Sequence, residues 1–341
     1  MYFIISCVAD SDGYAMAALS PASKKAIANL RAFAAPPTNY YKCPLKRRAA
    51  VLILLIADRV GDLRVVLTIR SAGLKNYAGQ AALPGGKADT LQETPWITAR
   101  REAWEEIGLP LTDSKLPPGY TVEHLAELPA NLAMTELGVR PCVAWLKTPA
   151  PTTRNPNPDA TRDLLPRMDA KEVAALFTAP FHNFLRMRDE DADTMRQVPG
   201  DWYKGSWHSW HESAWRMHSF SVPVSPSTVF LAKKPLSYMD PRLGKVQAPS
   251  ESQEEKEKKL DAAEDDALSQ PRYRVFGMTA RILVDAARVA YGEEPDFEHN
   301  SHFGDEDMIL KLLSIGRLNA VKKEGEWLDR DTMRKANEVK L

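Results

Sequence analysis

Three glutamates, Glu102, Glu105 and Glu106, follow Arg101 in a short segment behind a glycine pair. On an α-helix their spacing of i, i+3 and i+4 brings all three carboxylates onto nearly the same face. Adjacent like charges repel, and a divalent cation that prefers oxygen ligands, Mg²⁺ or Mn²⁺, converts that repulsion into ligation. The pattern therefore indicates a metal site that could hold a diphosphate.

Local signals at both ends predict the helix that carries these carboxylates. The hydroxyl of Thr94 can cap the first turn, Pro95 suits the first helical position, and Gly108 suits the residue after the last turn. The glycine pair Gly85 and Gly86 lets the backbone approach the same point closely. The main-chain carbonyl of Gly86 is thus a further candidate metal ligand.

The run from Glu93 to Leu109 resembles the signature of the Nudix hydrolases, GX5EX7REUXEEXGU, in which U is an aliphatic residue. The spacing matches throughout this run, with Ala103 at the first U position. Six residues instead of five separate Gly86 from Glu93, which bears on the role of Gly86 more than on the helix. The resemblance implies catalytic roles for the three glutamates and Arg101. We expect Glu93 to orient Arg101 or the loop and not to bind metal.

A second motif lies immediately upstream and narrows the resemblance. Residues 67–86 read LTIRSAGLKNYAGQAALPGG, similar to the pattern LLTXR(SA)X3RX3GX3FPGG of the coenzyme A diphosphatase branch. Lys75 replaces an arginine, which keeps the charge but loses the bidentate fork, and Leu83 replaces a phenylalanine. The substrate-binding residues that this resemblance implies are Arg70, Ser71, Lys75, Gly79 and Gly85.

The resemblance implies metal-dependent hydrolysis of a coenzyme A type diphosphate to 3′,5′-ADP and 4′-phosphopantetheine, or its acylated form. Bound Mg²⁺ would neutralise the phosphate charge and lower the pKa of a bound water. We expect Glu105 and Glu106 to be mainly ligands and Glu102 to be a ligand or the proton acceptor. Glu172 and Glu136 are further candidates for a ligand or a base.

Two other function classes remain open on the sequence. One is a Nudix hydrolase of another nucleoside diphosphate, such as ADP-ribose, NADH or an oxidised nucleotide. The other is a non-catalytic Nudix-fold binding protein, although such proteins usually lose the acidic residues that this chain keeps. Metal-dependent turnover of any diphosphate would separate these two classes.

Composition favours an intracellular enzyme acting on a small molecule. Lys plus Arg and Asp plus Glu both number 45 among 341 residues, so no global basic field indicates a nucleic acid partner. The three cysteines, Cys7, Cys43 and Cys142, are widely spaced and predict no structural disulfide. The segment 1–9 lacks the features of a signal peptide or a membrane span. Homo-oligomerisation stays open, as does the compartment: the peroxisome, for which the ending 339–341 (VKL) is a weak match, the cytoplasm or the mitochondrion.

The fold that the resemblance implies is α/β, an α/β/α sandwich around a mixed sheet. We expect an N-terminal extension over 1–45, a Nudix domain over 46–300 and a C-terminal extension over 301–341. Within the domain, 46–190 and 272–292 form the core, 197–222 is a tryptophan-rich insertion, and 237–271 is a charged low-complexity segment. Periodicity predicts helices over 21–35, 275–291 and 308–315, and strands over 49–57, 63–69, 121–128 and 138–146, with a hairpin turn at 59–62.

The tryptophan-rich insertion has two interpretations. Trp202, Trp207, Trp210 and Trp215 lie close together in the sequence, with two histidines among them. They could bury against the core, or their rings could form a wall for the adenine or the pantetheine arm of a substrate. An interface with a partner is a third use of this segment.

Overall fold

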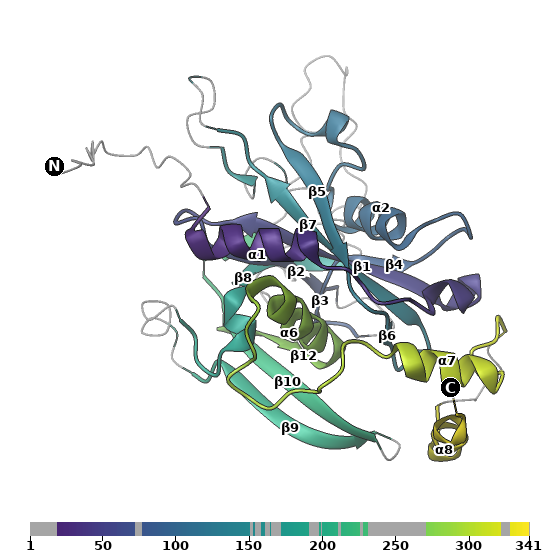
Figure 1. The fold of residues 1–341 in the computed structure, drawn as a ribbon. Helices are drawn as coiled ribbons and strands as arrows, with labels where there is room; N and C mark the ends of the chain where they lie inside the picture. Colours follow the sequence, from purple (N-terminus) through teal and green to yellow (C-terminus); the bar gives the residue numbers. More distant parts are fainter. Residues whose placement is uncertain are drawn as a thin grey trace, which may run out of the picture.

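A mixed sheet lies at the centre of the molecule, with helices on both sides (Figure 1). The computed structural model describes residues 19–71, 77–150, 153, 158–160, 164, 172–190, 198, 200–210, 213–225, 228–230, 271–321 and 328–340. The long strands of this sheet are β1 (Arg48–Ala57), β2 (Leu63–Arg70), β5 (Thr121–Glu127), β7 (Gly138–Lys147) and β8 (Val173–Pro180). Its short strands are β3 (Ala81–Ala82), β4 (Gly85–Lys87), β6 (Asn131–Leu132) and β11 (Val229–Phe230).

The main path of the sheet has the order β11-β8-β2-β1-β7-β5. β1 and β7 are parallel, whereas β1 with β2, β2 with β8 and β5 with β7 are antiparallel. β1 and β2 form the predicted hairpin, closed by a hydrogen bond of 2.9 Å from the Asp58 amide to the Asp62 carbonyl. The mixed sheet that the resemblance implied is therefore confirmed.

Each face of the sheet is covered by helices because its central strands carry apolar side chains on both faces. On one face, Leu52 and Leu54 of β1 belong to the same buried cluster as Ala103 of α2 (Pro95–Ile107). On the other face, α1 (Pro21–Ala32) and α6 (Gly277–Tyr291) bury residues such as Leu30 and Leu283 with the sheet. The architecture is an α/β/α sandwich, as expected.

A second sheet of three strands packs on the α6 side. It consists of β9 (Tyr203–Trp210), β10 (Ser213–Pro223) and β12 (Arg272–Phe276), in the order β12-β10-β9. Phe220 of β10 pairs with Val275 of β12, and both join the core cluster that also contains Trp202. In Figure 1, β9 and β10 extend below α6, on the side of the main sheet away from α2.

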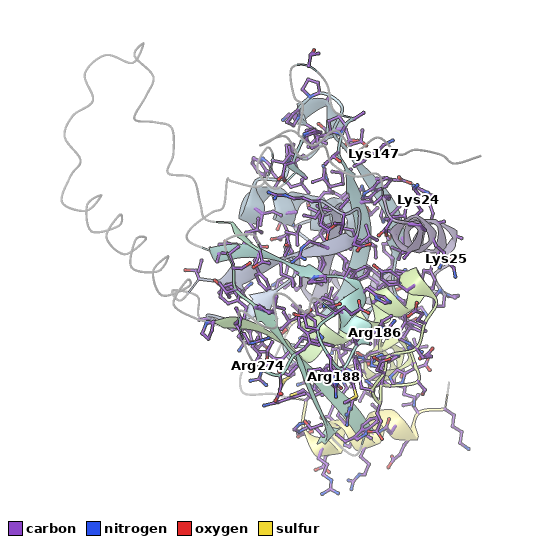
Figure 2. All side chains as sticks on the ribbon, turned by 90° about the vertical axis from the view of Figure 1, so that its left-hand side faces the viewer. Lys24, Lys25, Lys147, Arg186, Arg188 and Arg274 are labelled. Atoms are coloured by element: carbon purple, nitrogen blue, oxygen red, sulfur yellow. The ribbon has the colours of Figure 1, made fainter. Side chains whose placement is uncertain are left out.

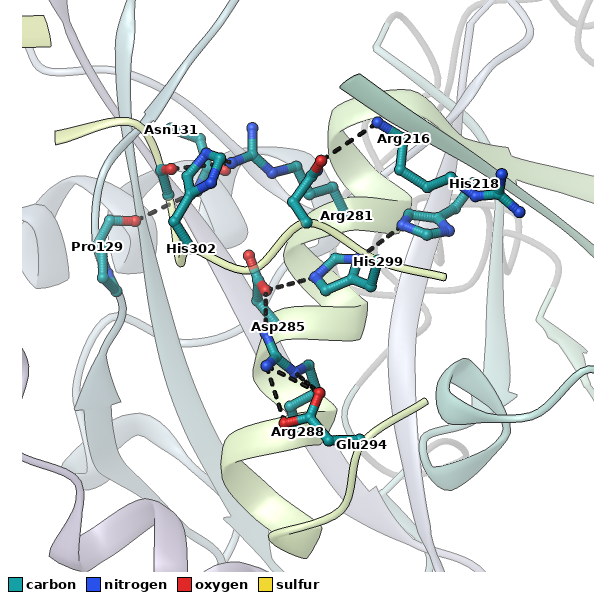
Figure 3. A network of polar contacts seen from close by, with 12 residues as sticks. Pro129, Asn131, Arg216, His218, Arg281, Asp285, Arg288, Glu294, His299 and His302 are labelled. Carbon is teal, nitrogen blue, oxygen red and sulfur yellow. Dashed lines mark hydrogen bonds and ion pairs between the residues drawn. The ribbon is translucent and has the colours of Figure 1, made fainter. Parts of the chain in front are cut away.

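A buried chain of polar contacts joins this second sheet to α6 (Figure 3). Nδ1 of His218 lies 3.0 Å from the Tyr203 hydroxyl, and its Nε2 lies 2.8 Å from Nδ1 of His299. Nε2 of His299 in turn lies 2.8 Å from a carboxylate oxygen of Asp285 on α6. Burial, together with neighbouring positive groups, lowers the pKa of His218 to about 3, so this ring is neutral near pH 7.

The last helices, α7 (Glu306–Ser314) and α8 (Arg330–Glu338), pack with the segment before β1. The carboxylate of Glu306 accepts hydrogen bonds from the Asn39 and Ala130 amides at 2.6 and 2.7 Å. Short 3₁₀ turns complete the fold: η1 (Tyr40–Lys42), η2 (Leu45–Arg47), η3 (Asp113–Lys115) and η4 (His182–Leu185). Within the described residues no helix combines the length and the apolarity needed to cross a membrane.

Predicted helix ends needed small corrections. α1 stops at Ala32 and not at residue 35, because Phe33 is extended and two prolines follow at 36–37. α6 begins at Gly277 and not at 275, because 272–276 pairs with β10 as β12. α7 covers 306–314 where 308–315 was expected. Residues 231–270, which contain most of the predicted charged segment, lie outside the described residues.

Candidate metal and diphosphate site

The ends of α2 are fixed by the residues that predicted them. The Thr94 hydroxyl accepts a hydrogen bond of 3.2 Å from the Ile97 amide, and Gly108 closes the helix with a φ of 71°. Ala99 and Ala103 are fully buried against the sheet. Burial of this small-residue stripe sets the rotation of the helix and brings Glu102 and Glu106 against β4.

The three glutamates of α2 occupy different environments. Glu106 is buried, at 5% exposed, and its Oε2 accepts a hydrogen bond of 3.1 Å from the Gly85 amide. The Glu102 side chain is 14% exposed, whereas that of Glu105 is 43% exposed. The cluster therefore grades from a buried carboxyl group to a solvent-facing one.

The glycine pair lies directly beside these carboxyl groups because β4 pairs with the first residues of β1, at positions 49–51. A Cβ atom built on Gly86 would lie 2.5 Å from Oε1 of Glu102. A Cβ on Gly85, whose φ is 156°, would overlap the Ala50 carbonyl and lie 2.6 Å from Cα of Val51. Both positions therefore require glycine, one for the carboxylate and the other for the neighbouring strand.

Arg101 holds the glutamates in place from the outer side of the helix. Its Nη1 donates to Glu102 and Glu105 at 3.0 and 3.1 Å, and its Nε donates to Glu93 at 3.1 Å. A further hydrogen bond of 2.7 Å runs from its Nη2 to the Lys87 carbonyl. Glu93 thus contacts Arg101, one of its two expected partners, and the pKa of Arg101 rises in consequence despite partial burial.

Burial and mutual repulsion oppose the ionisation of Glu106 and Glu102 more strongly than the neighbouring arginines favour it. Burial raises the pKa of Glu106 to about 8, with further increases from Glu102 and Glu172 and opposing effects of the Gly85 amide and Arg70. Burial also raises the pKa of Glu102, which Arg101 counteracts. Carboxyl groups that repel one another in a partly buried site fit a hard divalent cation. The donor set is therefore compatible with Mg²⁺ or Mn²⁺.

Glu172 lies near this cluster because of strand pairing between distant segments. It directly precedes β8, and its carbonyl accepts a hydrogen bond of 2.8 Å from the Ser71 amide at the end of β2. Its charge acts on both Glu102 and Glu106. Glu172 is exposed and thus able to face a substrate.

Glu136, the other acidic candidate, belongs elsewhere. It is fully buried, with a left-handed φ of 64°, and its carboxylate contacts Arg47 at 3.0 Å and Arg317 at 2.9 Å. Its role is structural, because it joins the segment before β1 to the segment after α7. Among the two acidic candidates, only Glu172 acts electrostatically on the α2 carboxylates.

The upstream motif begins within β2, and Arg70 is the last residue of that strand. Arg70 lies near the carboxylate cluster. The charge of Arg70 lowers the pKa of Glu106, and its buried Nε has no hydrogen-bond partner among the described residues. Gly79, with a φ of 70°, donates its amide to the Arg70 carbonyl at 2.9 Å and so closes the loop. Lys75 lies outside the described residues.

Trp202 and Trp207 of the tryptophan-rich segment differ in burial. Trp202 is buried in the core, and its Nε1 donates to the Asn183 carbonyl at 3.0 Å. Trp207 is 46% exposed, and its Nε1 donates to Glu298 at 2.6 Å. The strands β9 and β10 pack on the face of the main sheet opposite to α2. They therefore do not cover the helix that carries the glutamates.

A shallow hollow of about 310 Å³ lies at the opposite end of β8 from Glu172. Arg186 and Arg188, which line it, follow β8 and are labelled in Figure 2 together with basic residues of α1, β7 and β12. These labelled cations come from α1, β7, β12 and the segment after β8, and none belongs to α2 or β2. The α2 carboxylate cluster and this hollow are therefore different places.

Comparisons with known proteins place the chain in one family. The model of the NUDIX domain matches residues 46–212. The peroxisomal coenzyme A diphosphatase 1 of Saccharomyces cerevisiae is 28% identical over 89% of this chain and 88% of its own length. Nudix hydrolase 22 of Arabidopsis thaliana, which is chloroplastic, is 40% identical over 74% of this chain, which spans only 58% of that relative.

A bacterial relative is also covered over most of its length. The uncharacterised Nudix hydrolase NudL of Pectobacterium atrosepticum is 31% identical over 53% of this chain and 84% of its own length. A solved structure, the Nudix hydrolase RenU of M. smegmatis, is 27% identical over 32% of this chain and 67% of its own, with a TM-score of 0.22 that is too low to support an argument. From the domain match and the extent of the relatives, the chain belongs to the Nudix hydrolase family and is an enzyme of that family.

Proposed function

We propose that this Nudix hydrolase cleaves the diphosphate bond of coenzyme A or its acyl or oxidised derivatives, with Mg²⁺ or Mn²⁺ as cofactor. The observation that carries the proposal is the position of Arg70. This residue belongs to the motif that resembles the coenzyme A diphosphatase branch. Its positive charge lowers the pKa of Glu106 on α2, so the two side chains lie near each other. The name of the yeast relative, which spans most of both chains, supports the same substrate class.

The proposed roles follow from the environment of each side chain. Glu102, Glu105 and Glu106, with the carbonyl of Gly86, would hold the cation, which when bound supplies charge neutralisation and a more acidic water. Arg101 orients Glu102 and Glu105 through its two hydrogen bonds to them. Residues from the upstream motif would bind the substrate: Arg70, Ser71, Lys75, Gly79 and Gly85.

Arg70 is the side chain best placed to pair with a diphosphate oxygen. Its Nε is buried without a hydrogen-bond partner among the described residues, so an anionic substrate would satisfy a donor that is otherwise left unpaired. Proton transfer from the attacking water would fall to Glu102 or to Glu172. Both carboxylates lie near Glu106, and Glu172 is exposed to solvent.

Hydrolysis would place water oxygen on one phosphorus and break the bridging P–O bond. The products from coenzyme A would be 3′,5′-ADP and 4′-phosphopantetheine. We also propose a peroxisomal location, which the name of the yeast relative supports. A nucleic acid or membrane partner is not part of this proposal, and the oligomeric state stays open.

A panel of diphosphates tests the substrate assignment. The kcat/KM values of coenzyme A, dephospho-coenzyme A, ADP-ribose and NADH would be compared for the wild type, Arg70→Lys and Glu123→Gln. We expect coenzyme A to be preferred and Arg70→Lys to lower its kcat/KM, because lysine keeps the charge but loses the fork. The control Glu123→Gln removes a carboxylate that pairs with Arg31 at the surface and should leave turnover unchanged. Preference for ADP-ribose or NADH would contradict the proposal.

A further inference from the structure

Three potential metal ligands of different chemistry lie together on β5 and β7, apart from the α2 carboxylates. They are His124 and Glu127 of β5 and Cys142 of β7. One ligand atom of each lies within 4.8 Å of the other two. A thiol, an imidazole and a carboxylate form a donor set suited to cations of the zinc class.

A β-bulge brings the two β5 residues onto the same face. Residues three apart on a regular strand point to opposite faces. The pairing of β5 with β7 shifts between His124 and Ala126, which leaves Leu125 as the extra residue. As a result, His124 lies opposite Ala144 and Glu127 lies opposite Cys142, on the α2 side of the sheet.

The ring of His124 is held in one orientation. It stacks on Trp96 of α2 with 4.2 Å between ring centroids and 6° between planes. It also makes a backbone hydrogen bond with Ala126. Metal-bound histidines characteristically use one ring nitrogen for such a bond and the other for the cation. His124 is exposed, so an ion could enter from its side.

Glu127 is also supported by a neighbour that leaves one oxygen for a cation. Nε of Arg140 contacts Oε2 of Glu127 at 3.3 Å, and Nη1 of the same arginine contacts Glu306 at 3.1 Å. Glu306 therefore balances the charge of Arg140. Oε1 of Glu127 can then face an ion while Oε2 keeps its arginine partner.

Cys142 is the deepest of the three and, as a fully buried cysteine, would ordinarily be an inert core residue. Burial raises its thiol pKa well above the usual range. The other described cysteine, Cys43, shows the ordinary case. It is also buried, and its Sγ contacts the Asn39 carbonyl at 3.8 Å. What distinguishes Cys142 is the oriented imidazole and the supported carboxylate beside it.

We propose that His124, Glu127 and Cys142 bind one zinc-class divalent cation at the bulge between β5 and β7. On binding, the Cys142 S–H proton passes to solvent and the thiolate sulfur ligates the cation. The thiolate and Glu127 together then carry the two negative charges that neutralise it. The site is distinct from the oxygen-rich site on α2 and does not depend on the proposed function.

Co²⁺ is the probe, because a thiolate ligand gives it a near-ultraviolet charge-transfer band that an all-oxygen site cannot produce. Full-length protein freed of metal would be titrated with Co²⁺ in excess Mg²⁺, which competes with Co²⁺ for the oxygen ligands on α2. We expect one equivalent of Co²⁺ with the thiolate band for the wild type and for Cys43→Ser. Cys142→Ser should abolish the band, and His124→Gln should weaken Co²⁺ binding about tenfold or more.

Two outcomes would overturn the proposal: a wild type without a thiolate band, or equal loss of the band in Cys43→Ser and Cys142→Ser. If Cys142→Ser fails to fold, His124→Gln decides, because it changes an exposed side chain. Zn²⁺ should also raise the Tm of the wild type and of Cys43→Ser, but not that of His124→Gln. An equal rise in all three would contradict binding at this site.

Discussion

The Gly85 amide donates a hydrogen bond of 3.1 Å to Oε2 of Glu106, and this contact joins β4 to α2. Glu106 is buried, and burial raises its pKa. The hydrogen bond from the Gly85 amide is one of the interactions that favour the ionised carboxylate. β4 thus contributes a hydrogen-bond donor from Gly85 as well as the space beside Gly86. A bound cation would stabilise the ionised carboxylate further, in the same direction as the amide hydrogen bond.

Glu106→Gln should lower hydrolysis on the order of a hundredfold or more while leaving the fold intact. The amide oxygen of glutamine can still accept from Gly85, but the charge that would hold a cation is lost. Steady-state kinetics with Mg²⁺ and thermal unfolding in EDTA would be measured together. Turnover close to that of the wild type would remove Glu106 from the metal site, whereas a large fall in Tm would indicate a structural role.

Without metal, stability should fall as pH rises from 6 to 8.5. Burial raises the folded-state pKa of Glu106 to about 8, so between the unfolded value and about 8 the folded state binds more protons. Stability from this group is therefore present at low pH and lost as pH rises through the folded pKa.

Denaturant unfolding in EDTA across this range would check the trend. Mg²⁺ should restore stability most strongly at high pH, because the cation and the proton compete for the same carboxylate. Glu106→Gln should flatten the pH dependence. A wild-type curve that rises with pH, or one that the variant does not change, would show that Glu106 is not the responsible group.

Gly86→Ala should reduce activity about a hundredfold, because its Cβ would lie 2.5 Å from Oε1 of Glu102 and displace that carboxylate. Gly138→Ala is a matched control on another strand, where the nearest atom to the new Cβ is Sγ of Cys43 at 3.4 Å. Both kcat and KM would be measured at saturating Mg²⁺. Equal effects of the two substitutions would mean that the space beside Glu102 has no special importance.

His218 should make the protein less stable as pH falls from 7 to 5. Its pKa is about 3 in the folded state, so the unfolded chain takes up the proton first. One such group changes the free energy of unfolding by at most about 1.4 kcal/mol per pH unit, which sets the largest slope to expect. His218→Gln should flatten this slope in denaturant unfolding.

His182 provides a control of opposite sign. Its hydrogen bond with Glu190 raises its pKa, so it stabilises the folded state at low pH and that contribution is lost as pH rises. His182→Gln should therefore steepen the loss of stability below pH 7. The same change in slope for both variants would show that burial in the Tyr203–His299 chain does not control the titration of His218.

Local signals were enough to predict the helix that carries the site. Thr94 and Gly108 mark its ends through hydrogen bonds within a few residues, and the structure keeps both. The hairpin of β1 and β2 was predictable for the same reason. Contacts between distant segments were not predictable in this way. β12 pairs with β10, although residues 224–271 separate the two strands. The first two residues of the predicted helix 275–291 therefore belong to β12 and not to α6.

Long-range pairing also decided between the two acidic candidates. Sequence spacing gave Glu172 and Glu136 equal standing as a further ligand or base. β8 pairs with β2 and brings Glu172 near Glu106, whereas Glu136 is enclosed by Arg47 and Arg317. Neither arrangement has a local signal, because each depends on which strands and termini meet in the folded chain.

The central claim is that the α2 carboxylates and Arg70 support metal-dependent cleavage of a coenzyme A diphosphate. Mass spectrometry of products from coenzyme A, with Mg²⁺ or with EDTA, tests this claim most directly. We predict 3′,5′-ADP and 4′-phosphopantetheine from the wild type with Mg²⁺, and neither product with EDTA or with Glu106→Gln. Intact coenzyme A after incubation of folded wild type with Mg²⁺, or equal turnover in EDTA, would contradict the claim.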